Sequence, residues 1–130
     1  NTRGEAGVVA IFIGRIAEGK PCIIYGDGKQ TRDYIYIGDV VEANYRALSS
    51  PVGIYNIGTS KETSVNELVE IFSQILNSRV ERVYEKPRTG ELFRNSLDIN
   101  LARKELNWQP KIDIFQGIRL TYEYFNQNRE

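Results

Sequence analysis

Residues 22–40 read CIIYGDGKQTRDYIYIGDV, and this stretch decides which fold the sequence predicts. Residues 22–25 and 34–37 are β-type runs, and the second run alternates Tyr and Ile between its two faces. The loop between them is rich in Gly and Asp, and Arg32 stands where the loop enters the second run. An arginine on a short rigid element beside aromatic rings suits an anion attached to a flat ring, such as a nucleotide phosphate. The alternative is an ordinary surface hairpin in which Arg32 pairs with a neighbouring aspartate.

The amino-acid composition is that of an ordinary soluble globular protein. The chain has 130 residues, of which 41% are hydrophobic and 26% charged, enough for one modest domain with its own core. Lys plus Arg and Asp plus Glu each number 17, so bulk attraction to nucleic acid or to an anionic membrane is not expected. No apolar run approaches the roughly 20 residues of a membrane span, and no signal peptide opens the chain. We therefore expect a cytoplasmic protein with no nucleic-acid or membrane partner.

Cysteine is rare, and histidine and methionine are missing, and each of these facts limits what the chain can do or be. Cys22 is the single cysteine, so an intramolecular disulfide is excluded and a reducing cytoplasm fits. The chain has no histidine, which excludes a Ser-His-Asp triad, a Cys-His dyad and most zinc sites within it. It also has no methionine, so it lacks an initiator and we expect it to be a piece of a longer protein.

Apolar periodicity predicts helices that alternate with short strands. Capping-box spacing marks the starts of three helices, because an Asp or Ser is followed three residues later by Glu or Gln. These pairs are Asp39 and Glu42, Ser64 and Glu67, and Asp113 and Gln116. We expect helices over residues 8–18, 39–48, 65–76 and 100–106 and after residue 113, and strands over residues 22–25, 34–37, 54–57, 80–85 and 95–98. This alternation predicts an α/β or α+β fold.

Two partial matches to catalytic or cofactor motifs fall in the glycine-rich loop. Tyr25 and Lys29 have the Y-x-x-x-K spacing of short-chain dehydrogenases, which requires a helix to bring the two side chains together. Gly26 and Gly28 make that helix unfavourable. Residues 26–31 also resemble a dinucleotide-binding fingerprint, but the last Gly is missing and a strand is expected where the motif needs a helix. We therefore predict a turn with neither function.

A second basic site lies in residues 87–92, which read PRTGEL. Pro87 stiffens the entry to this loop and Gly90 permits a tight bend. Arg88 and Glu91 on such a loop could bind a phosphate and a sugar diol, respectively. The alternative is a solvated surface loop.

Several motifs in a fixed order give the chain a family resemblance. They are GVVAIFIGR at residues 7–15, IIYGDGKQTRDYIYIGDVV at 23–41, YNIGT at 55–59 and PRTGE at 87–91, followed by D-x-x-x-A at 98–102 and L-x-W-x-P at 106–110. Together they resemble the C-terminal half of the NAD-dependent nucleotide-sugar epimerases/dehydratases, the extended short-chain dehydrogenases/reductases. The resemblance covers nearly the whole chain and is closest to the UDP-glucose (UDP-galactose) 4-epimerases of that family.

The resemblance implies a role for each matching residue. It implies that Tyr25 and the backbone near Ile23 hold a uracil ring, and that Arg32 and Arg88 bind the diphosphate from two sides. It also implies that Glu91 accepts hydrogen bonds from the ribose. The full set of implied substrate-binding residues is Val8, Val9, Ile23, Tyr25, Arg32, Arg88 and Glu91, the first two through their backbone at the start of a helix.

The resemblance also implies an activity for the parent protein. It implies the interconversion of UDP-glucose and UDP-galactose through an NAD-dependent 4-keto intermediate, in a homodimeric enzyme. The family's glycine-rich NAD loop, catalytic Ser/Thr and true Y-x-x-x-K lie in its N-terminal Rossmann half, which is absent here. Residues 1–130 are accordingly expected to form a single nucleotide-sugar binding domain that is inactive alone. The alternatives are a fragment of a dTDP-glucose 4,6-dehydratase or UDP-glucuronate decarboxylase, or a non-catalytic nucleotide-diphosphate binding module.

Overall fold

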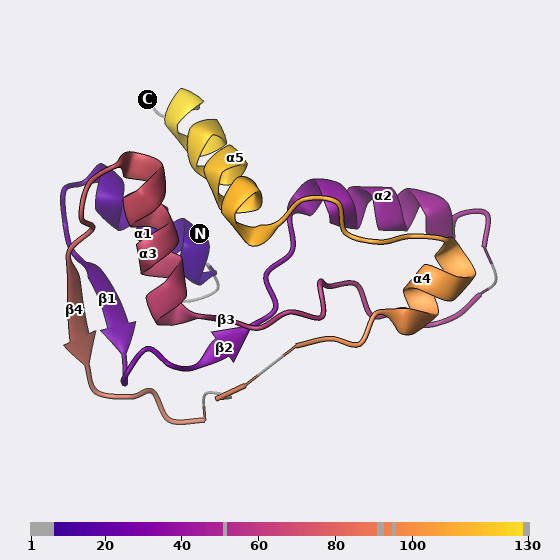
Figure 1. Cartoon of the computed structure of the whole chain (residues 1–130), viewed down its shortest axis with the longest axis horizontal. Coiled ribbons are helices and arrows are strands. Elements are labelled where there is room, and N and C mark those ends of the chain that lie inside the picture. Colours follow the sequence, from indigo (N-terminus) through magenta and orange to yellow (C-terminus); the bar gives the residue numbers. More distant parts are fainter. Residues whose placement is uncertain (1–6, 51, 91–92, 95, 129–130) are drawn as a thin grey trace. The chain divides into compact units, whose positions relative to one another are not determined.

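A computed structural model describes residues 7–50, 52–90, 93–94 and 96–128, and these form two compact units that we treat separately (Figure 1). Unit 1 comprises Asn1–Gln30, Ser64–Glu91 and Ile118–Glu130, and unit 2 comprises Thr31–Thr63 and Leu92–Gly117. Each unit is therefore assembled from segments that are distant in the sequence. The expectation of one domain over residues 1–130 stays a prediction.

Unit 1 is built around two parallel strands, β1 (Cys22–Tyr25) and β4 (Arg82–Glu85). They lie side by side in register, and Tyr25 pairs with Glu85 at their carboxyl ends (Figure 1). Strand β1 buries alternate side chains, since Cys22 and Ile24 are both fully inaccessible. The expected strand over residues 22–25 is confirmed, and the strand expected over residues 80–85 forms in its second half.

Helices α1 (Val8–Ala17) and α3 (Val65–Leu76), with the later part of α5 (Ile114–Gln127), complete unit 1. Their aromatic side chains meet in the core, where Phe72 makes edge-on contacts with Phe12 and with Tyr122, each at a centroid distance of 6.4 Å. Such pairs contribute beyond the area that they bury. The expected helices over residues 8–18 and 65–76 are confirmed within a residue or two.

Unit 2 contains the short strand β2 (Thr31–Arg32) and helices α2 (Ile37–Ala47) and α4 (Asn100–Leu106). The two-residue strand β3 (Thr63–Ser64), which pairs with β2, begins at the last residue of the first segment of the unit. The expected helix over residues 100–106 is confirmed. The core of the unit consists of Ala43, Ile99, Ala102, Leu106 and Trp108, with Ile35, Tyr55 and Ile57 packed against it.

Two of the three predicted helix caps form as expected. The Ser64 hydroxyl oxygen accepts a hydrogen bond from the backbone N–H of Glu67 at 3.1 Å, and Asp113 accepts from that of Gln116 at 2.8 Å. The cap predicted at Asp39 is wrong, because α2 begins at Ile37 and Asp39 is buried inside its first turn. Its carboxylate instead accepts hydrogen bonds from the backbone N–H groups of the segment that follows Trp108, at 3.1 and 3.2 Å.

Three expected strands do not form. Residues 34–37 are wrong as a strand, because the ladder forms at Thr31–Arg32 and α2 begins at Ile37. Residues 54–57 are not a strand either, since Tyr55 and Ile57 pack onto the core of unit 2 without a partner strand. In the range 95–98, residues 96–98 are irregular and Asn95 lies outside the described residues.

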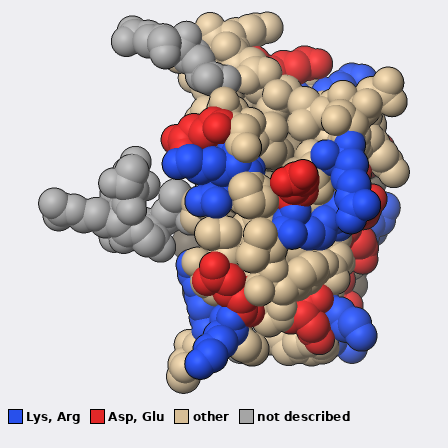
Figure 2. Space-filling view, turned by 90° about the vertical axis from the view of Figure 1, so that its left-hand side faces the viewer, with Lys and Arg blue, Asp and Glu red and all other residues tan. Residues whose placement is uncertain are grey.

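The surface carries charges of both signs. Figure 2 shows Lys and Arg side chains interspersed with Asp and Glu over the face that it presents. None of the helices in the described part of the chain combines the length and apolarity needed to cross a membrane.

Candidate functional site

The carboxyl edge of the β1–β4 pair is the candidate site in unit 1. The strands are parallel, so their carboxyl ends meet at the same edge, where the Gly26 N–H donates to the Glu85 carbonyl at 2.8 Å. At this edge the backbone leaves β1 through the turn after Tyr25 and leaves β4 into the loop that contains Arg88. Ligands of open α/β sheets bind outside the carboxyl ends of the strands.

Two of the predicted site residues meet at this edge. The guanidinium carbon of Arg88 lies 3.9 Å from the centroid of the Tyr25 ring, which is a cation–π contact. Tyr25 is half-buried, whereas Arg88 is exposed. A guanidinium stacked on a ring keeps its N–H donors in its own plane, where they can bind an anion. The pair therefore combines a flat apolar surface with a permanent positive charge.

The turn after Tyr25 is held in place by α3. Gly26 and Gly28 have φ values of +84° and +76°, in the region that favours glycine. A Cβ on Gly28 would lie 2.1 Å from the Asn66 side-chain oxygen, so glycine is also needed for space. The Asn66 side-chain amide donates to the Asp27 carbonyl at 3.0 Å, and its backbone N–H donates to the Gly28 carbonyl at 3.0 Å.

The conformation of this turn rules out both partial motifs of the glycine-rich loop, the Y-x-x-x-K match and the dinucleotide-binding match. Tyr25 ends strand β1 and Lys29 follows the glycine-rich turn, so no helix brings the two side chains together and the rejection of the Y-x-x-x-K reading is confirmed. After Gly28 the chain enters β2, and no helix N-terminus follows the glycines to receive a pyrophosphate. The glycine-rich turn of this chain therefore does not fit NAD, and no step of a reaction is assigned to it.

Arg32 lies in unit 2, on β2. Its side chain is half-buried, and one guanidinium nitrogen donates to the Thr31 carbonyl at 2.7 Å. The Thr31 hydroxyl donates to the Glu62 carboxylate at 3.0 Å, and Arg94 binds the same carboxylate through two nitrogens at 2.9 and 2.6 Å. These hydrogen bonds lower the pKa of Glu62, and the Glu62 carboxylate raises the pKa of Arg94. The placement of Arg32 against Arg88 stays a prediction, because the two belong to different units.

The remaining predicted residues are placed as follows. Val8 and Val9 are half-buried and form the first turn of α1, which follows Gly7 and contains no acidic side chain. Their N–H groups belong to the first four of the helix, which have no acceptor inside it. Ile23 is half-buried on β1, on the face opposite Cys22 and Ile24. Glu91 lies outside the described residues.

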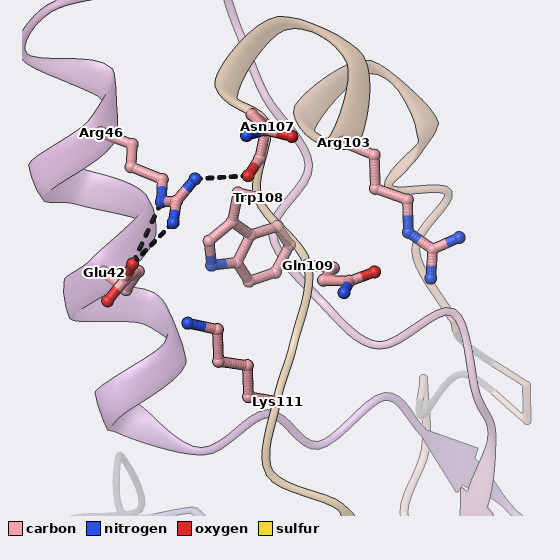
Figure 3. A pocket seen from close by; sticks show the side chains of 7 residues that line it. All are labelled: Glu42, Arg46, Arg103, Asn107, Trp108, Gln109 and Lys111. Carbon is pink, nitrogen blue, oxygen red and sulfur yellow. Dashed lines mark hydrogen bonds and ion pairs between the residues drawn. The ribbon is translucent and has the colours of Figure 1, made fainter.

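Sequence reasoning missed two features of unit 2. One is the hydrogen-bond network of Asp33, whose donors lie 26 to 64 positions away in the sequence. The other is a hollow of about 440 Å³ between α2 and the segment after α4 (Figure 3). In it Arg46 binds Glu42 through two nitrogens at 3.0 and 3.1 Å and also donates to the Asn107 carbonyl. No sequence motif marks this hollow, since its residues come from two segments that are more than 50 positions apart in the chain.

Comparisons with known proteins identify related sequences. Residues 1–58 match the NAD dependent epimerase/dehydratase family. A relative from Methanocaldococcus jannaschii, provisionally assigned as a UDP-glucose 4-epimerase, is 48% identical over 126 residues, which are 97% of this chain and 41% of the relative. More distant matches carry the names UDP-glucuronic acid decarboxylase and dTDP-glucose 4,6-dehydratase.

Solved structures of related enzymes resemble this chain over nearly its whole length. The UDP-glucose 4-epimerase of Thermotoga maritima, solved with UDP-glucose, is similar with a TM-score of 0.92 and 41% identity, covering 100% of this chain and 42% of that one. The Thermus thermophilus enzyme, solved with NAD, has a TM-score of 0.89 and 37% identity, covering 99% of this chain and 43% of that one. The chain thus spans about two fifths of the length of these proteins. The family resemblance and the mixed fold inferred from the motifs are confirmed. The chain is thus similar in sequence to members of the NAD-dependent epimerase/dehydratase family, and its fold resembles the C-terminal portion of the extended short-chain dehydrogenases/reductases.

Proposed function

We propose that this chain is the substrate-binding part of a UDP-hexose 4-epimerase that interconverts UDP-glucose and UDP-galactose through an NAD-dependent 4-keto intermediate. The observation that supports it most directly is the stacking of Arg88 on Tyr25 at the carboxyl edge of the parallel strands. The similarity of this chain to an epimerase solved with UDP-glucose supports a UDP-hexose as the ligand. NAD and the catalytic residues would lie in the part of the relatives that this chain does not span.

Each predicted residue has a physical role in this proposal. Tyr25 and the backbone at Ile23 flank the uracil ring, and Arg88 and Arg32 donate forked hydrogen bonds to the diphosphate. Glu91 accepts hydrogen bonds from the ribose hydroxyls. The N–H groups of Val8 and Val9 at the first turn of α1, which have no acceptor within the helix, favour the anionic ligand from a further side.

The chain alone would bind and not turn over its ligand. It has no histidine, and its Tyr25, at the end of β1, and Lys29, after the turn, are not brought together on a helix as an acid–base pair requires. The proposed activity therefore belongs to the longer protein that the relatives represent.

The experiment combines binding and turnover. Isothermal titration of the protein that contains this sequence is expected to show tighter binding of UDP than of uridine, because the arginines contact the diphosphate. With NAD present, UDP-galactose is expected to yield UDP-glucose, measured by chromatography. Release of CO₂ from UDP-glucuronate, or formation of a 4-keto-6-deoxy sugar from dTDP-glucose, would replace the epimerase by one of the other family activities.

A further inference from the structure

The side chain of Asp33 joins three segments of unit 2 at one point. The backbone N–H of Thr59 donates to its two carboxylate oxygens at 2.9 and 3.1 Å, and the Thr59 hydroxyl donates at 2.5 Å. The backbone N–H groups of Ser60 and Leu97 donate at 2.8 and 3.2 Å. Hydrogen bonds to an ionised acceptor are shorter and stronger than those between neutral groups. One carboxylate thus ties the end of β2 to two loops.

The loops around Asp33 are shaped to accept this carboxylate. A Cβ on Gly58 would lie 2.8 Å from an Asp33 oxygen, so the close approach of the backbone requires glycine there. Ser60 has a φ of +61°, which is uncommon for a residue with a side chain. Its hydroxyl donates to the Leu97 carbonyl at 2.6 Å, which helps to hold this conformation.

Arg32 lies between two fixed neighbours. On one side, the Thr31 N–H donates to the Phe93 carbonyl at 2.7 Å and the Thr31 hydroxyl donates to Glu62 at 3.0 Å. On the other side lies Asp33 with its network. The backbone of Arg32 is therefore held from both directions, which reduces the ordering cost when its long side chain binds a ligand.

We propose that Asp33 is a positioning residue for Arg32. Its carboxylate holds the backbone that carries Arg32, so that the guanidinium is presented to the diphosphate, while Asp33 itself does not touch the ligand. This inference rests on the proposed function and adds a residue to its site.

The test is Asp33→Asn in the protein that contains this sequence. Asparagine keeps one acceptor oxygen, but its NH₂ group would face a backbone N–H donor, so the network cannot be restored. We expect UDP to bind roughly tenfold more weakly, since about 1.4 kcal/mol corresponds to a factor of ten, and uridine to bind as before. In an Arg32→Ala background, Asp33→Asn is expected to cause no further loss of UDP affinity.

A matched control makes the same change in charge at an aspartate that lies outside the Asp33 network. Asp98 is exposed and accepts one local hydrogen bond, from the Asn100 N–H at 3.0 Å. Asp98→Asn is therefore expected to leave the affinities for UDP and uridine unchanged. If Asp33→Asn fails to fold, as judged by circular dichroism, Thr59→Val replaces it. That variant removes the hydroxyl, which donates to Asp33 at 2.5 Å and accepts from the Lys61 N–H at 3.1 Å, and leaves the backbone donors to Asp33 in place. A smaller loss of UDP affinity with unchanged uridine affinity is expected.

The outcomes separate this inference from the proposed function. Equal losses for UDP and uridine, no loss for either, or a full loss that persists in the Arg32→Ala background would each overturn the positioning role. If Arg32→Ala itself leaves UDP binding unchanged, the assignment of Arg32 in the proposed function is wrong, and the inference falls with it.

Discussion

Removal of the Arg88 side chain would separate its contact with Tyr25 from its proposed contact with the ligand. Its guanidinium lies 3.9 Å from the centre of the Tyr25 ring, at the edge where both strands end. In the free protein this contact is an exposed cation–π pair, worth about 0.5–1 kcal/mol. Arg88→Ala is therefore expected to lower the free energy of unfolding by no more than that amount.

The larger effect is expected on binding. A hydrogen bond to a charged group contributes about 1.5–3 kcal/mol. Loss of the donors of Arg88 should therefore weaken UDP binding by roughly ten- to a hundredfold, since about 1.4 kcal/mol is a factor of ten. Arg88→Lys keeps the charge but not the planar fork, so only part of the affinity should return.

The assay is titration calorimetry with UDP and with uridine, which has no phosphates. Uridine is expected to bind weakly and to be nearly indifferent to Arg88→Ala, whereas Tyr25→Leu should weaken both ligands because it removes the surface for the base. Arg103→Ala is the control, since Arg103 is an exposed arginine on α4 in the other unit. It makes the same change in charge.

Two results would refute this reasoning. If Arg88→Ala binds UDP as tightly as the parent, Arg88 is a surface charge that rests on a tyrosine. If it weakens UDP and uridine by the same factor, its role is to support the base and not to bind the diphosphate.

Three further predictions concern the scaffold. Gly28→Ala should lower the free energy of unfolding by about 1–3 kcal/mol in urea titrations, because its φ is +76° and a Cβ would lie 2.1 Å from Asn66, whereas Gly14→Ala, with open space on a helix, should not be destabilising. Trp108→Phe should cost roughly 1–3 kcal/mol in the same titrations, since it leaves the Asp39 carbonyl without the buried indole donor at 2.9 Å; an unchanged midpoint would contradict this. Burial raises the pKa of the Cys22 thiol to about 11, so little thiolate exists at pH 8 and Ellman's reagent should react slowly until denaturant is added. Rapid reaction of the native protein would show that Cys22 is accessible.

Local signals in the sequence predict the elements that depend on neighbouring residues. The Ser64 and Asp113 caps form because their donors lie three residues away, and β1 is identified by its short apolar run. The stacking of Arg88 on Tyr25 could not be read from spacing, although both residues were singled out. It depends on the parallel pairing of two strands that are far apart in the sequence.

The incorrect predictions have a common cause, which is competition from distant partners. Asp39 has the spacing of a cap, but backbone N–H groups more than 70 positions away along the chain take its carboxylate. Residues 34–37 have the alternation of a strand, yet Ile35 packs against the core of unit 2 and α2 starts at Ile37. Period-two alternation of side-chain type therefore does not guarantee a partner strand.

The contacts of Phe72 have a consequence for synthesis on the ribosome. Its ring touches Phe12, from a helix translated much earlier, and Tyr122, from a helix translated last. Domains generally fold as units during synthesis, at about 5–20 residues per second. Unit 1 can pair β1 with β4 while the ribosome is still translating, but its aromatic core remains open until α5 leaves the exit tunnel. A nascent chain stalled before α5 should therefore expose the Phe12 and Phe72 rings to chaperones, and release of the last helix should end that exposure.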